Sequence, residues 1–187
     1  VIGSLTDVLM DATNFTDSLL IQINSDGSAP STGTLDAANN NIGIGKDVFS
    51  ALTSGDSNIA IGVIACEDLT TAEHNVLIGT AAGKNITTSS SNIGIGVNAL
   101  VTHTVSGGAG VNATAAMNVA IGYDSCDSLT DGFRNTAVGK DSGQKITEGH
   151  NNVSIGSDCY GPTTGYNCIG IGYDANHADA GNHEIVI

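Results

Sequence analysis

Four aspartates recur at a regular spacing, and they have the arrangement best suited to chemistry in this chain. Asp124, Asp141, Asp158 and Asp174 follow one another at intervals of 17, 17 and 16 residues, and Asp47 holds the same place in an earlier copy of the pattern. If the copies stack, these carboxylates lie about 5 Å apart along one edge. Such a row could bind Ca²⁺, which prefers oxygen ligands, or could consist of solvated corner residues. We favour the solvated corner and expect no resident cofactor, because the calcium-binding pattern G-G-x-G-x-D does not occur.

A second candidate for ligand binding is a group of tyrosines near the C-terminus, Tyr160, Tyr166 and Tyr173. Only 4% of the residues are aromatic, and an exposed tyrosine ring stacks well on a sugar. The alternative is that these rings fill the core of the last repeats. Asn112 is a further candidate, because it lies in a nine-residue insertion within one repeat, and insertions into repeat proteins often carry binding residues. The alternative for the insertion is a tolerated surface loop.

The sequence lacks recognisable enzymatic motifs. It contains no HExxH, no paired-cysteine zinc spacing, no nucleophile elbow and no Walker motif. The glutamates are scattered along the chain, so the acid and base pair of a glycosidase is not evident. Segments such as "GIGKDV" approach the dinucleotide-binding fingerprint, but no helical pattern follows them. We therefore expect a protein that is not an enzyme.

The elements that would position these residues are copies of one five-residue phrase. "NIGIG" at Asn41 returns six times, unchanged at Asn92 and elsewhere in variants such as "NIAIG" and "NVSIG", at intervals of 17, 17, 17, 26, 17 and 17 residues. A weaker copy, "CIGIG", begins at Cys168. We expect a truncated ninth copy in "NHEIV", from Asn182. A fixed short period indicates turns that stack on their neighbours. The seven regular copies share Asn at the first place and Gly at the fifth: Asn41 and Gly45, Asn58 and Gly62, Asn75 and Gly79, Asn92 and Gly96, Asn118 and Gly122, Asn135 and Gly139, Asn152 and Gly156.

Within each copy, counted from the asparagine as position 1, the residues alternate as in a short β-strand. Positions 2 and 4 are Ile or Val almost throughout, and position 3 is mostly Gly, Ala or Ser. The period of two predicts one apolar face, and we expect this face to form a buried ladder that includes Ile61, Ile78, Ile95 and Ile121. The small residues at position 3 are then expected on the opposite face, where another backbone approaches. Glycine at position 5 predicts a turn with a positive φ.

The predicted fold is all-β, a parallel β-solenoid or β-roll of 17-residue turns over residues 41–187. Positions 12 and 13 read Leu-Thr or Ile-Thr in five copies, beginning with Leu52 and Thr53, and predict a second short strand in each turn. Residues 1–40 lack the period. There "LTDVLM" and "SLLIQI" predict two short strands of a connector or capping segment, and the alternative is a partly ordered linker.

The composition excludes several classes of function. The chain has 187 residues, no Trp and 25 Gly, which leaves bulk only for a thin, long core. Five Lys and Arg against nineteen Asp and Glu give a net charge of −14, so neither nucleic acid nor an anionic membrane surface is an expected partner. No apolar run approaches the ~20 residues that span a bilayer.

Four cysteines are present, at Cys66, Cys126, Cys159 and Cys168. No two of them occupy the same repeat position in adjacent turns, so stacking brings no pair together. We expect free, buried thiols.

The "N-x-[AG]-I-G" phrase resembles the head repeats of trimeric autotransporter adhesins, and more closely the "NTAIG"-type repeats of phage tail fibres. The likeness covers about Asn41 to Ile187, although the turns here are longer than those of the autotransporter heads. The segment from Gly3, "GSLTDVLMDATNFTDSLLIQ", also resembles connector segments of phage fibres. The resemblance implies a homotrimeric parallel β-roll that projects from a virion or cell and contacts a glycan or protein receptor on a host surface.

The expected function is therefore that of a structural and adhesive segment of a viral tail fibre or similar surface appendage, located in the virion or outside a cell. A lone roll would bury few aliphatic side chains per turn, which also favours the homotrimer. The alternatives are the head of a bacterial trimeric adhesin and a β-helical polysaccharide depolymerase, which would need a carboxylate pair facing a groove between chains. The chain begins at Val1 and is interpreted as a piece of a longer protein.

Overall fold

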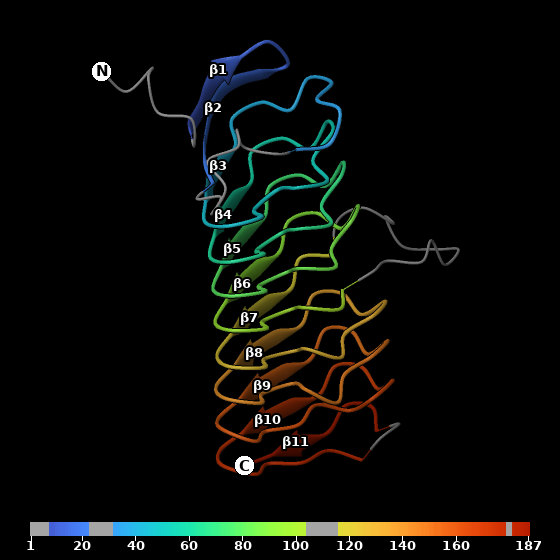
Figure 1. Ribbon diagram of the computed structural model, residues 1–187. Helices are drawn as coiled ribbons and strands as arrows, with labels where there is room; N and C mark the ends of the chain where they lie inside the picture. Colours follow the sequence, from blue (N-terminus) through green and yellow to red (C-terminus); the bar gives the residue numbers. More distant parts are fainter. Residues whose placement is uncertain (1–7, 23–31, 104–115, 179–180) are drawn as a thin grey trace.

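The computed structural model describes residues 8–22, 32–103, 116–178 and 181–187, and it confirms an all-β parallel solenoid (Figure 1). The strands form one sheet in chain order, in which β2 to β11 are parallel and β1 pairs with β2 in the antiparallel sense. They are β1 (Val8–Ala12), β2 (Phe15–Ile21), β3 (Ile42–Ile44), β4 (Ile59–Ile61), β5 (Val76–Ile78), β6 (Ile93–Ile95), β7 (Val119–Ile121), β8 (Thr136–Val138), β9 (Val153–Ile155), β10 (Ile169–Ile171) and β11 (Ile185–Val186).

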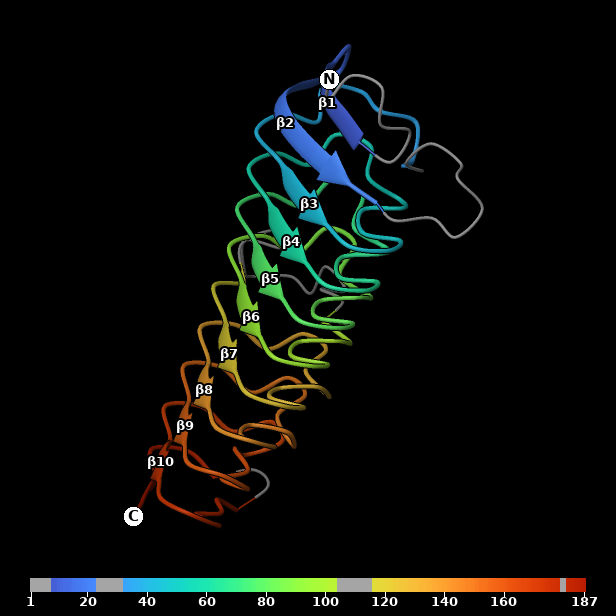
Figure 2. The ribbon, with the colours of Figure 1, turned by 60° about the vertical axis from the view of Figure 1, so that its left-hand side comes forward.

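The repeat fixes the register of the sheet, because each residue pairs with its equivalent in the next copy. Ile42 pairs with Ile59, and Ile59 pairs with Val76. The register also holds across the 26-residue interval, where Ile93 pairs with Val119. Figure 2 shows the resulting single column of strands along the rod.

In the three-residue strands of the repeat, the face predicted to be buried is the exposed one, and the face predicted to lie outside is buried. The position 3 residues Ala60, Leu77 and Ala120 are fully buried, whereas Ile42 and Ile95 are 39% and 37% exposed. The prediction of a buried ladder through Ile61, Ile78, Ile95 and Ile121 is therefore wrong. These side chains lie on the outer face of the sheet, where they are partly or largely exposed.

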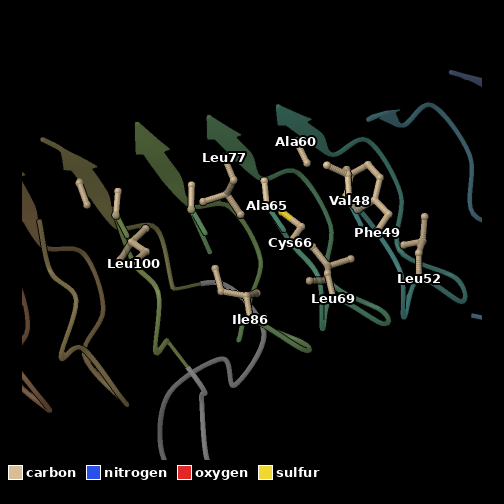
Figure 3. Packing of buried hydrophobic residues seen from close by; sticks show 14 of the residues in the cluster. Val48, Phe49, Leu52, Ala60, Ala65, Cys66, Leu69, Leu77, Ile86 and Leu100 are labelled. Atoms are coloured by element: carbon tan, nitrogen blue, oxygen red, sulfur yellow. The ribbon is translucent and has the colours of Figure 1, made fainter. Parts of the chain in front are cut away.

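Crowding inside the solenoid explains the small residues at position 3. A Cβ on Gly43 would lie 2.6 Å from Leu20 Cδ1 and 2.8 Å from Phe49 Cδ2. The interior is filled from positions 8, 9 and 12 of each turn, as Val48, Phe49 and Leu52 illustrate (Figure 3). Position 3 is therefore small because its own turn leaves little room, and not because a neighbouring chain approaches there.

The second strand predicted at Leu52 and Thr53 and at their equivalents is not formed in the described turns. The Leu52 amide donates to the Phe49 carbonyl at 3.1 Å, so this segment is turned within its own coil. Hydrogen bonds between coils do occur here, as between the Thr53 amide and the Thr70 carbonyl at 3.0 Å. Each described turn thus contributes one strand, and the remainder of the turn is irregular.

The glycine at position 5 turns the chain as predicted. Its φ lies between 128° and 142° in all eight copies, and a Cβ on Gly45 would overlap the carbonyl oxygen of Gly62 in the next turn. Any other residue would therefore be strained and would separate the coils.

Both ends of the solenoid differ from the regular turns. The two strands expected before residue 40 are formed as the β1–β2 hairpin, and Leu19 of β2 pairs with Ile42 as a preceding repeat would. At the other end Ile185 pairs with Ile169, so Glu184 takes the asparagine position. The ninth copy expected from Asn182 is thus displaced by two residues.

Candidate interaction faces

The most extensive candidate site is the outer face of the parallel sheet, here called the sheet face. It consists of the side chains at positions 2 and 4, which come from the three-residue strands and alternate with the buried position 3. Eight turns at about 4.8 Å and three residues at about 3.3 Å make it roughly 40 Å long and 10 Å wide. Its members in β3 to β10 are Ile42, Ile44, Ile59, Ile61, Val76, Ile78, Ile93, Ile95, Val119, Ile121, Thr136, Val138, Val153, Ile155, Ile169 and Ile171.

Apart from Thr136, the sheet face is apolar from β3 to β10, and its members include no titratable group. Many of its isoleucines remain more than one-third exposed, with Ile44 at 37% and Ile171 at 42%. Just beyond the strands, position 6 adds exposed Val63, Tyr123 and Tyr173, together with the charged Lys46 and Lys140. Contiguous apolar surface of this extent marks an interaction site. The face can bind by excluding water, since all its side chains except that of Thr136 are hydrocarbon.

The aspartate column lies at the corner that follows the position 5 glycine. Asp124, Asp141, Asp158 and Asp174 have φ values of 51° to 57°, in the left-handed region that Asp and Asn tolerate best. Asn98 Nδ2 donates to Asp124 Oδ1 at 2.8 Å. The described carboxylates therefore serve the backbone conformation, and no group of three or more His, Cys, Asp or Glu in the described ranges is placed to hold a metal ion.

Lys140 contacts two members of the aspartate column. Its ammonium group pairs with Asp141 and lies 3.7 Å from Asp158 Oδ1, and these carboxylates raise the pKa of the lysine. The repulsion expected between stacked carboxylates is thereby reduced in two successive turns.

The structure does not bring the three tyrosines into one site. Tyr166 stacks on His150, with ring centroids 5.1 Å apart, and meets the edge of His183 at 5.3 Å. Lys145 Nζ lies 4.7 Å from the centre of the Tyr160 ring. Tyr173 is 80% exposed near the end of β10. Of these, Tyr173 has the ring most open to a ligand, and Asn112 lies outside the described residues.

An aromatic ladder was missed by the sequence analysis. It lies two residues before the next copy, which is position 16 in the 17-residue turns and position 15 in the 16-residue turn that begins at Asn152, and is here called position 16 in both. Phe133, His150 and Tyr166 come from three successive turns, and the Phe133 and His150 rings are 4.7 Å apart and nearly parallel, at 5°. The spacing matches the rise per turn, so the rings cover one another's faces. Aligning position 16 of the last turns would have found this ladder.

A buried asparagine ladder at position 1 was also missed. Asn41 Oδ1 accepts from the Asn58 amide at 2.9 Å and from Asn58 Nδ2 at 3.1 Å, and the Asn58 Nδ2 also donates to the Ala72 carbonyl at 2.8 Å. Equivalent bonds recur at Asn75, at Asn118 and at Asn135. The repeated asparagine is therefore a structural residue, because each side chain satisfies a buried backbone amide of the next coil.

Comparison of the chain with family models, curated proteins and solved structures found no match. None of the described residues forms a helix long and apolar enough to cross a membrane. All four cysteines are buried and free, and burial raises the pKa of the Cys126 thiol to about 12. Among the surfaces described, the sheet face is the most extensive and the most uniform.

Proposed function

We propose that the chain is a structural and adhesive segment of a viral tail fibre or similar surface appendage, assembled as a homotrimer that attaches to a host or other surface. The observation that carries the proposal is the sheet face. A single chain leaves this apolar strip in water along the whole rod, and burial of apolar surface is the main driving force of association.

The dimensions of the sheet face suit side-by-side association of chains. A stable interface buries about 800 Å² per partner, and the sheet face with its position 6 margin is of that order. Identical chains have the same rise per turn, so parallel copies would keep the same side chains in contact along the rod. The number three comes from the resemblance of the repeats to those of trimeric fibres.

Three copies that bury their sheet faces around a common axis would leave the loop corners of every turn on the outside. Those corners, with the aromatic ladder, would then be the surface that meets a glycan or protein receptor. We place the assembly in the virion or outside a cell, as an appendage.

Sedimentation equilibrium tests the assembly. The 18.7 kDa chain should sediment as a trimer at micromolar concentration, and Ile95→Lys should weaken the trimer by more than about 100-fold, because three lysines would enter an apolar seam. Thr88→Lys, which adds the same charge at an exposed loop position, should leave the trimer intact. A monomeric wild-type chain would contradict the proposal, whereas a trimer that tolerates Ile95→Lys would move the interface elsewhere.

Attachment is tested by binding of the labelled wild-type assembly to cells of candidate hosts. The trimer should bind with an avidity that the Ile95→Lys monomer lacks. Equal binding by both forms would argue against an adhesive role for the assembled fibre.

A further inference from the structure

A histidine replaces the usual aliphatic residue of the core in one turn of the solenoid. Position 12 is Leu or Ile in five described turns, as at Leu52 and Leu129, but it is His103 in the turn that begins at Asn92. The His103 side chain is fully buried. It lies directly before residues 104–115, in the turn that contains the insertion. This is the one histidine that occupies a core position shared by aliphatic residues in the other turns.

The hydrogen bonds of His103 satisfy only one side of its ring. Nε2 lies 2.9 Å from the Gly132 carbonyl oxygen, which requires that Nε2 carries the hydrogen. Nδ1 is then an acceptor, and it meets no hydrogen-bond partner in the part of the chain that the structure describes. Protonation would place a second N–H at Nδ1, where the described residues offer no acceptor.

The asparagine ladder also changes at this turn. In the other regular turns the Asn Nδ2 donates to a carbonyl 13 or 14 residues later, as Asn118 does to Gly132 at 3.0 Å. Among the described residues, Asn92 Nδ2 donates to Ser89 Oγ at 2.9 Å and to the Ser90 carbonyl at 3.3 Å. Within the described residues, both of these acceptors of the Asn92 side chain thus come from the preceding coil.

The surroundings of His103 favour the neutral ring. Burial lowers its pKa, and the bond to the Gly132 carbonyl and the charge of Asp131 oppose this only in part. Its polar neighbours Asn118 and Gly132 are uncharged, and only the Gly132 carbonyl accepts a hydrogen bond from the ring. Because the folded state binds the proton more weakly than an exposed histidine does, stability is lost as the pH falls through the ordinary histidine range.

We propose that His103 is an acid-sensitive element of the solenoid, whose protonation opens the corner that Asn92, His103 and Asn118 form between β6 and β7. At a pH above the ordinary histidine range the ring is neutral and keeps the two coils together. In acid an imidazolium would have to remain buried with one N–H unpaired, so the open corner, in which water hydrates the ring, is favoured. The sheet pairing of β6 with β7 is separate from this corner and can persist.

Hydrogen exchange of the full chain at pH 7 and pH 5, corrected for intrinsic rates, tests the proposal. Peptides that cover 92–103 and 116–135 should exchange faster at pH 5 by up to about tenfold for each pH unit below the pKa of the open state. His103→Leu should abolish this acid response, since Leu is the residue of the equivalent position in other turns. His74→Leu, at an exposed histidine, should retain it.

Asp131→Asn supplies a second, independent variant, because it removes the charge that opposes the effect of burial. It should enlarge the acid response. Acid opening that persists unchanged in His103→Leu would overturn the proposal. If that variant fails to fold, an acid response that Asp131→Asn does not enlarge would overturn it.

Discussion

The sheet face and the position 16 corner change in different ways along the same rod. From β3 to β10 the sheet face keeps Ile or Val at almost every place, with Thr136 as the exception. At position 16, Asp56, Glu73 and Ser90 precede the insertion, and the aromatic ladder of Phe133, His150 and Tyr166 follows it. The sheet face thus keeps an apolar character in nearly every turn, whereas the residue at the corner changes in chemical type along the rod. This difference supports the sheet face as the surface of assembly and the corners as the surface that varies with the ligand.

The largest effect is expected when a charge is placed on the inner residue of one strand, in comparison with the same charge on its outer neighbour. Ala120→Asp places a charge in the filled interior and should cost about 3–5 kcal/mol of unfolding free energy. Ile121→Asp, on the neighbouring residue, should cost the isolated chain less than about 1 kcal/mol, because Ile121 is 36% exposed. Urea unfolding under monomeric conditions measures both. Equal losses of unfolding free energy would indicate that the sheet face is part of the core.

A smaller effect is expected at the aromatic ladder. Phe133→Glu removes the ring that stacks on His150 and should lower the unfolding free energy by about 1 kcal/mol. The reciprocal change Glu73→Phe adds a ring between Asp56 and Ser90, where no aromatic partner exists, and should change it by less than about 0.5 kcal/mol. If Glu73→Phe stabilised the protein as much as Phe133→Glu destabilised it, the two corners would not differ in the way described here.

The smallest effect is a gain in stability at position 7. Ile64 has a φ of 53°, whereas the equivalent Asn98 has a φ of 56° and a side chain suited to that conformation. Ile64→Asn should raise the unfolding free energy by about 1 kcal/mol, because a β-branched residue is strained in the left-handed region. Ile61→Asn, on the strand of the same turn, should give no such gain, and thermal unfolding of the two variants provides the comparison.

The sequence predicted the strand positions and the glycine turns because both are local properties. The spacing of the copies placed each strand within the correct residues, and position 5 required a residue that accepts a positive φ. The alternation of Ile42, Gly43 and Ile44 showed that the strand has two faces but did not show which face is inside. That choice depends on the room left by Leu20 of the neighbouring β2 and by Phe49, later in the same turn.

The features missed by the sequence analysis depend on contacts between coils. Asn58 bonds to Asn41, and Phe133 covers His150, only after the turns have stacked in register. His103 is unusual only in comparison with Leu and Ile at the same place in other turns. The aspartates were selected by residue type and regular spacing, and the tyrosines by residue type and by their clustering near the C-terminus. The structure gives the aspartates of the column a role in the backbone conformation.

The unbroken pairing of Ile93 with Val119 across the longest interval between copies has a consequence for how such a rod can change in length. Extra residues at a corner leave the pairing untouched, and removing one whole 17-residue copy would shorten the rod by about 4.8 Å while the remaining coils kept the same kinds of neighbour. The reach of the protein is thus set by the number of copies, and what it carries at its corners is set by their loops. Either property can change by insertion, deletion or duplication without a redesign of the other.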